Sequence, residues 1–419
     1  MFIQLHALTS YPGTLLNRDD AGFAKTLPFG GATRTRVSSQ CLKYHWRNFK
    51  GEHALYDMDV PRSLRSRETF YRRLVEPLAE EGHPKPLVAA AALALQERLL
   101  SDDKVNLSPL KSLLKQEDDP REVLETSQVT IFGAPEMRYL RDLASDKVAE
   151  VTEEFPVFLN GEEPDSGTLS DAAKALRDFS KRDLRKNLKG LQLASGLDAA
   201  MFGRMATSDV LARGDAAVHV AHAFTTHAQE NESDYFSAVD ELRRDEPEES
   251  GELGAGHINT QDLTSGLFYS YVVIDVPLLV SNLEGVDRTD WQDADRTLAG
   301  EVVRRFVHLM ATVSPGAKLG STAPYSYAQC LFAETGTAQP RTLANAFQSP
   351  ARTDDVLANS YEKLGRYVDE IDQMYGVQTD RRLAAMGPTD GLLERLKVDG
   401  TTSVPEIATW TANQMQRGA

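Results

Sequence analysis

The sequence predicts an α+β fold, in which a sheet with helices on one face is interrupted by insertions. Two observations predict it. Segments typical of strands and helices follow one another in the order strand, helix, strands, helix, strand. A stretch from about 51 to 195 is mostly helical in pattern and separates the first helix from the later strands. The split ferredoxin-like arrangement of RNA-recognition modules has this order, so we expect it here with the helical stretch as an inserted lobe.

The first strand and the first helix lie within the first 50 residues. Residues 2–9 alternate as expected for a strand, and Tyr11-Pro12-Gly13 ends it. A loop rich in Gly, Thr and Arg then leads to Ser38-Ser39-Gln40, which predicts a helix N-terminus. Helical spacing places Leu42, Trp46 and Phe49 on one face, which we expect to be buried. Gln40, Lys43 and Arg47 share a different, polar face.

The later elements follow from the same kinds of pattern. The inserted lobe has polar breaks near residues 81 and 161, and its last predicted helix spans residues 171–189. Beyond it the predicted strands are 199–205, 217–226, 266–280 and 325–333, and the predicted helices are 296–311 and 353–374.

Composition limits the class of protein. The 419 residues carry a formal net charge of -16, with 41% hydrophobic and 26% charged residues and no apolar run long enough to span a membrane. The start MFIQLHALTS lacks the pattern of a secretory signal. Two cysteines in so long a chain are typical of a reducing compartment. We therefore expect a cytoplasmic protein without a membrane partner.

The net charge conceals a strong segregation of charge. Residues 17–50 hold seven bases against two acids, whereas residues 228–252 hold ten acids against two bases. The predicted helix 171–189 adds a second basic stripe, again seven bases against three acids. A basic patch on an acidic protein indicates one confined polyanion site, and the alternative is an ordinary solvated surface.

The most informative block runs from LNRDD at Leu16 to FGGATRTRVSSQCLK at Phe29. Its two glycines permit close backbone approach, and a helix N-terminus presents free N–H groups to an anion. Arg34 and Arg36 supply planar donor forks, and Lys43 and Arg47 extend the positive face along the helix. The block therefore predicts a site for phosphates, although such loops also serve in purely structural turns.

These motifs resemble the amino-terminal signature of the CasC family, the multi-copy backbone subunit of the type I-E CRISPR Cascade complex. The resemblance continues in order through GRMATS at Gly203, AHAFTTH at Ala221, DYFSAVD at Asp234 and SGLFYSY at Ser265. It ends with Pro315-Gly316-Ala317-Lys318 and with LANAF at Leu343. Residues 51–195 resemble the family only in general character.

The resemblance implies a hand-shaped subunit with an RRM-like palm, a helical fingers insertion and a β-rich thumb insertion. The implied divisions are palm at 1–50, 196–204 and 263–349, fingers at 51–195, thumb at 205–262 and a C-terminal helical segment at 350–419. The implied function is a non-catalytic scaffold that polymerises along guide RNA and presents its bases to target DNA. Its implied partners are guide RNA, target DNA, other copies of itself and other Cascade subunits, without a cofactor or a metal.

The residue types and the resemblance together predict two sets of site residues. The predicted RNA-binding residues are Asn17, Arg18, Lys25, Arg34, Arg36, Ser38, Ser39, Gln40, Lys43, Arg47, Lys174 and Lys181. The family wedges apolar groups beside a displaced nucleotide at positions that match Met205, Tyr235 and Phe236. Aromatic faces suit that role because they stack on any base.

Two enzymatic or metal-binding alternatives compete with the scaffold. The first is a metal-dependent endoribonuclease that uses the carboxylate pair Asp19-Asp20, although neighbouring side chains on an extended segment point apart. The second is a zinc site made of His219, His222 and His227, although the surrounding strand-like pattern makes convergence of the three rings difficult. Nucleotide-binding and hydrolase motifs are absent from the sequence.

Overall fold

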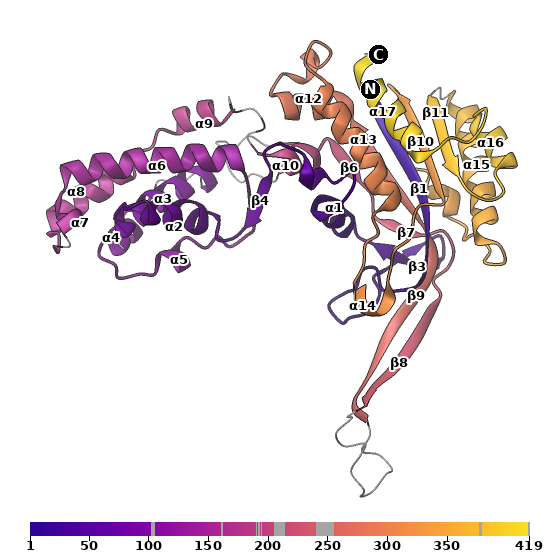
Figure 1. Ribbon diagram of the computed structural model, residues 1–419, viewed down its shortest axis with the longest axis horizontal. Helices are drawn as coiled ribbons and strands as arrows, with labels where there is room; N and C mark the ends of the chain where they lie inside the picture. Colours follow the sequence, from indigo (N-terminus) through magenta and orange to yellow (C-terminus); the bar gives the residue numbers. More distant parts are fainter. Residues whose placement is uncertain are drawn as a thin grey trace, which may run out of the picture. The chain divides into compact units, whose positions relative to one another are not determined.

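The computed structural model describes residues 1–101, 105–160, 162–189, 191, 193, 195–204, 214–239, 255–317, 319–376 and 379–417. The chain forms two compact units (Figure 1). The first, here called the sheet unit, comprises residues 1–58, 219–276 and 296–419. The second, here called the helical unit, comprises residues 59–218 and 277–295.

In the described part of the chain, the sheet unit is built on one sheet of nine strands. The strands are β1 (Phe2–Thr14), β2 (Thr26–Phe29), β3 (Ala32–Val37), β6 (Val218–Val220), β7 (Ala223–Thr225), β8 (Asn231–Val239), β9 (Ala255–Asp275), β10 (Cys330–Gly336) and β11 (Asp380–Ala385). Their main order is β11-β10-β1-β9-β7-β3-β2, and neighbours in this order are antiparallel. β6 and β8 also pair with β9. In Figure 1, β8 and the paired part of β9 form a two-stranded ribbon that extends from the rest of the sheet.

Helices cover both faces of this sheet, whereas the sequence predicted helices on one face. The helices are α1 (Ser39–Asn48), α13 (Thr297–Thr312), α14 (Leu319–Thr322), α15 (Val356–Tyr375), α16 (Asp390–Leu396) and α17 (Val404–Arg417), with short 3₁₀ turns η1 (Leu55–Asp57) and η4 (Ala344–Phe347). Tyr361 and Leu364 of α15 pack on the face that contains Leu8 and Tyr269. The opposite face contains Ile3, and α13 packs there. Because helices cover both faces, successive residues of β1 are buried on both sides of the strand.

The helical unit is organised around one apolar helix. Its elements are β4 (Ser63–Ser66), η2 (Tyr71–Val75), α2 (Glu76–Glu80), α3 (Lys85–Leu100), α4 (Leu107–Leu114), α5 (Pro120–Val123), β5 (Thr130–Gly133), α6 (Ala134–Glu154), α7 (Val157–Asn160), α8 (Ser166–Leu176), α9 (Lys181–Lys189), α10 (Leu197–Phe202), α12 (Val276–Glu284) and η3 (Arg288–Asp290). Residues 87–95 of α3 are all buried. A helix that is apolar on every side must lie at a centre, and α2, α4, α6 and α8 all contact α3.

Several elements differ from the sequence prediction. Residues 199–205 were predicted to be a strand, but residues 197–202 form α10, because six residues are too few for apolar periodicity to separate helix from strand. The predicted helix 171–189 is divided between α8 and α9. The predicted strand 266–280 ends at Asp275, where α12 begins. The C-terminal segment, predicted as helical, also contains the edge strand β11.

The helices 296–311 and 353–374 are confirmed, with ends shifted by one to three residues, as α13 and α15. The final predicted strand is shifted along the chain and forms β10. No helix among the residues that the structure describes is both long enough and apolar enough to cross a membrane.

Candidate nucleic-acid interface

Three of the sequence motifs meet at Arg34, which lies on β3. The Arg34 side chain is fully buried, and Nη1 donates hydrogen bonds to the carbonyl oxygens of Thr225 at 3.1 Å and Thr226 at 2.8 Å. Nη2 donates to the carbonyl oxygen of Phe347 at 2.8 Å. Burial lowers the pKa of the guanidinium from its ordinary value. The prediction that Arg34 offers its guanidinium to phosphate is therefore wrong, because three backbone carbonyls in the protein interior hold that group.

The structure explains the two glycines of the FGG motif, the first of them by a close contact near Phe347. Gly30 has φ +62°, and a Cβ built on it would lie 1.5 Å from the carbonyl oxygen of Gln348. Gly31 has φ +77° and open space around it. Gly30 thus lets the β2–β3 turn touch the chain just after LANAF, on the same side as the Arg34–Phe347 hydrogen bond.

A cluster of basic side chains lies beside this structural block. We call Lys25, Arg36 and His222 the basic cluster. Arg36 Nε donates to the carbonyl oxygen of Thr26 at 2.9 Å, and Arg36 Nη1 lies 3.2 Å from His222 Nδ1. Burial lowers the pKa of His222, and the positive charges of Arg36 and Lys25 lower it further. Arg36 Nη2 has no hydrogen-bond partner in the described part of the chain, so the guanidinium retains donors for a ligand.

Helix α1 begins next to the basic cluster. Lys25 acts electrostatically on Cys41, which lies in the first turn of α1, where burial raises the thiol pKa and Lys25 opposes that rise. No acidic residue lies in this first turn, and Arg47 lies in the last. The positive end of the helix dipole therefore adds to the charge of Lys25, and both favour an anion.

The polar residues around the start of α1 divide into structural and exposed groups. Ser38 is buried and caps the helix, its Oγ accepting from the Cys41 N–H at 3.3 Å. Asn17 Oδ1 accepts from the Ser38 N–H at 3.0 Å and so holds the loop against the helix. Gln40 is exposed, and Ser39 is partly exposed. The cap explains why the sequence has serine at 38.

The remaining predicted cations of the sheet unit lie on two elements. Arg18 is exposed in the loop after β1, in an isolated bridge with Ala24. Lys43 and Arg47 are half-buried on α1. Trp46 between them packs its ring against Phe306 of α13 at 5.1 Å, which sets the orientation of the helix.

The carboxylate pair does not form a joint site. Asp19 Oδ1 accepts hydrogen bonds from the N–H groups of Ala21 at 3.0 Å and Phe23 at 2.9 Å, so it shapes the loop. Asp20 is exposed. Among the residues that the structure describes, no group of three or more His, Cys, Asp or Glu side chains is placed to hold a metal ion.

The three histidines of the alternative zinc site are engaged separately. His222 contacts Arg36, as described above. His227 is buried, and its Nε2 accepts from the Leu267 N–H at 3.3 Å. His219 is exposed on β6. The sequence pattern placed His222 only in the alternative zinc site, which its strand-like surroundings disfavour. It did not indicate the position beside Arg36, because that position depends on the pairing of β3 with β7.

The other predicted residues lie elsewhere. In the helical unit, Lys174 is exposed and pairs with Asp171 at 2.8 Å, and Lys181 donates to the Ser101 carbonyl at 3.3 Å. Tyr235 and Phe236 lie on β8, opposite Thr260 and Asn259 of β9.

Met205 and residues 240–252 of the acidic stretch 228–252 lie outside the described residues.

Comparisons with known proteins give a family and a fold. The model of a family described as CT1975-like protein matches residues 3–410. A chain of a structure titled "CRISPR RNA-guided surveillance complex, pre-nicking" aligns with a TM-score of 0.72 and 23% identity, covering 99% of this chain and 100% of that one. A chain of a "CRISPR RNA-guided surveillance complex" aligns with a TM-score of 0.64 and 20% identity over the same shares. The comparison with curated proteins gives no match.

Proposed function

The chain belongs to the CT1975-like protein family, and on that premise we propose that it is a scaffold subunit that holds CRISPR guide RNA by its phosphates. The family match agrees with the resemblance to CasC, a Cascade-type subunit, that the ordered sequence motifs indicated. The two similar structures carry titles of RNA-guided surveillance complexes, which supports the same role.

The observation that carries the proposal is the convergence of Lys25, Arg36 and His222 beside the N-terminus of α1. Positive charge, unused guanidinium donors and a helix N-terminus suit a phosphate. Contacts of this kind position a strand without reading its bases, so a guide of any sequence fits. The exposed Arg18 and Gln40 extend the proposed contact, together with Lys43 and Arg47 on α1.

The palm in this proposal is the RRM-like part of the sheet. The elements β1, α1, β7, β9, α13 and β10 follow in chain order, and their strands lie in the order β10-β1-β9-β7. The elements β1, α1 and β7 form one strand-helix-strand half, and β9, α13 and β10 form the other. This order supports a split ferredoxin-like arrangement. The proposed thumb is the ribbon of β8 and β9, with Tyr235 and Phe236 beside a displaced nucleotide.

We further propose a type I-E assembly in the cytoplasm in which several copies share one guide RNA that pairs with target DNA. Contact between the thumb of one copy and the palm of the next would be heterologous, which produces a filament instead of a closed dimer. The proposed function is non-catalytic, and the structural use of Asp19, whose Oδ1 accepts two backbone N–H bonds within its loop, supports it.

Co-purification tests the proposal. The protein, expressed with a CRISPR array and its neighbouring subunits, should retain RNA of uniform length. Limited nuclease digestion should give protected fragments at a regular interval, one for each copy of the chain. An RNA-free monomer that also fails to bind added guide RNA at low salt would overturn the scaffold role.

A further inference from the structure

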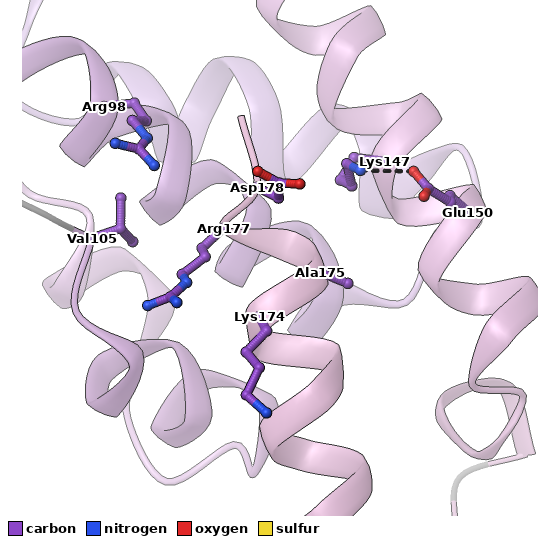
Figure 2. Close-up of a pocket in the computed structure, with 8 residues that line it drawn as sticks. All are labelled: Arg98, Val105, Lys147, Glu150, Lys174, Ala175, Arg177 and Asp178. Atoms are coloured by element: carbon purple, nitrogen blue, oxygen red, sulfur yellow. Dashed lines mark hydrogen bonds and ion pairs between the residues drawn. The ribbon is translucent and has the colours of Figure 1, made fainter. Parts of the chain in front are cut away.

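The helical unit contains a pocket of about 650 Å³, and Figure 2 shows its lining. The pocket lies between the C-terminal end of α3, the C-terminal half of α6 and the C-terminal end of α8. Its volume is in the range of sites for small ligands. Four basic side chains and two acidic ones line it, namely Arg98, Lys147, Lys174 and Arg177 against Glu150 and Asp178. The lining therefore has a formal excess of two positive charges.

Two of the four cations already have carboxylate partners. Lys147 pairs with Glu150 at 2.7 Å, as the dashed line in Figure 2 shows, and Lys174 pairs with Asp171 at 2.8 Å. Arg98 and Arg177 make no ion pair or hydrogen bond through their side chains with any residue that the structure describes. Among the described residues, these two guanidinium groups are thus the cations of the pocket that have no carboxylate partner.

Arg98 provides a second, independent indication of a ligand. Its Nε is buried and has no hydrogen-bond partner among the described residues. A buried donor without an acceptor costs free energy on the order of 1–3 kcal/mol, and most such groups in folded proteins are satisfied. An oxygen-rich anion in the pocket would supply that acceptor once the Arg98 side chain turns to expose Nε, which has almost no accessible surface in this structure.

We propose that this pocket binds a terminal phosphate monoester, carried by a free nucleotide or by the end of a nucleic-acid strand. Guanidinium forks match phosphate oxygens geometrically. A monoester carries about two negative charges at neutral pH and a backbone phosphodiester carries one, so two guanidinium groups attract the monoester more strongly. Arg98 and Arg177 are held near the last turns of α3 and α8, where the helix dipoles stabilise cations before a ligand arrives.

This site is separate from the proposed guide contact. All eight lining residues lie between 98 and 178 in the helical unit, whereas the basic cluster and α1 lie in the sheet unit. The pocket shares Lys174 with the predicted RNA-binding residues, so the test uses Arg98 and Arg177, which are not among them.

Calorimetry on the full-length protein at low ionic strength tests the proposal. The probes are AMP, adenosine, inorganic phosphate, and a short oligothymidylate with either a 5′-phosphate or a 5′-hydroxyl. We expect saturable binding of at least one phosphorylated probe and no pocket-dependent binding of its unphosphorylated counterpart. Arg98→Gln and Arg177→Gln should each weaken that binding about ten-fold or more. The matched control is Arg138→Gln, an exposed arginine of α6 outside the lining, which should bind as the wild type does.

The outcomes separate the two sources of phosphate. Pocket-dependent binding of AMP and inorganic phosphate identifies a free ligand, and pocket-dependent binding of the 5′-phosphorylated strand alone identifies a strand end. The proposal is overturned if no phosphorylated probe saturates, or if Arg98→Gln and Arg177→Gln bind it as tightly as the wild type. Arg98→Lys keeps the charge and should bind better than Arg98→Gln, and equal thermal unfolding of the variants excludes loss of the fold.

Discussion

Arg34 Nη2 donates to the carbonyl oxygen of Phe347 at 2.8 Å, which joins a residue of β3 to η4 across 313 positions of the chain. The same guanidinium binds the carbonyls of Thr225 and Thr226 at the end of β7. Three of the ordered motifs therefore meet through one side chain. An arginine that looks available for phosphate in the sequence holds together the sheet that carries the basic cluster.

Arg34 should consequently affect folding more than ligand contact. Arg34→Met leaves three carbonyls without their donor, and we expect a loss of about 3 kcal/mol in the free energy of unfolding of the RNA-free protein. Arg34→Lys should recover only part, because an ammonium lacks the planar fork. Urea unfolding measures both, with the exposed Arg352→Gln as control. Unchanged stability of Arg34→Met would contradict the structural role.

The two glycines of FGG provide a matched pair. Gly30→Ala places a Cβ against the Gln348 carbonyl and should cost more than about 3 kcal/mol, since the backbone must move. Gly31→Ala meets open space and should cost only the strain of a positive φ, about 1 kcal/mol. Chemical unfolding compares the two variants. Equal costs would mean that the contact with Gln348 is not tight in the folded protein.

The basic cluster should determine affinity for guide RNA without determining stability. Lys25→Gln and Arg36→Gln should each weaken binding of guide RNA about ten-fold and reduce the salt dependence of binding by about one phosphate contact. Filter binding at several salt concentrations measures both quantities. Arg352→Gln, an exposed cation outside the cluster, serves as the control. Variants of the cluster that bind like the control would refute the proposed contact.

His308 should make the stability of the sheet unit depend on pH. Burial lowers its pKa from 6.5 to about 4, helped by His53, whose ring stacks on it at 3.7 Å, and by Arg304. In the unfolded chain the imidazole binds a proton near its ordinary pKa of 6.5, and in the native state only near 4. The unfolded state therefore binds more protons between these values, and stability is full above pH 6.5 and declines as the pH falls.

His308→Phe tests this dependence because the ring keeps its stacking partner and loses its titration. Between pH 6.5 and 4 the free energy of unfolding of the variant should fall by about 2 kcal/mol less than that of the wild type. Urea unfolding across the pH range measures the difference. Parallel curves for the two proteins would show that His308 does not titrate differently on folding.

The purified protein with bound RNA should leave that RNA intact in magnesium. Asp19 holds its loop through two N–H bonds, so Asp19→Ala should loosen the loop by about 1 kcal/mol and change no cleavage pattern. Gel analysis of end-labelled RNA over hours provides the measurement. Periodic cuts that disappear in Asp19→Ala would establish the endoribonuclease in place of the scaffold.

The sequence determined the order of the elements and the location of the basic block, because both depend on short-range patterns. Helices 296–311 and 353–374 were predictable from periodicity, and the N-cap at Ser38 from its residue type. Only the tertiary structure decided which cations face solvent. The pairing of β3 with β7 directs Arg34 inward and places Arg36 beside His222, and that pairing joins residues more than 180 positions apart. Alternation along a strand shows that two arginines two residues apart share a side, but not what covers it. Contacts across the sheet and with η4 supply that information. They show that Arg34, predicted to contact phosphate, instead binds backbone carbonyls in the protein interior.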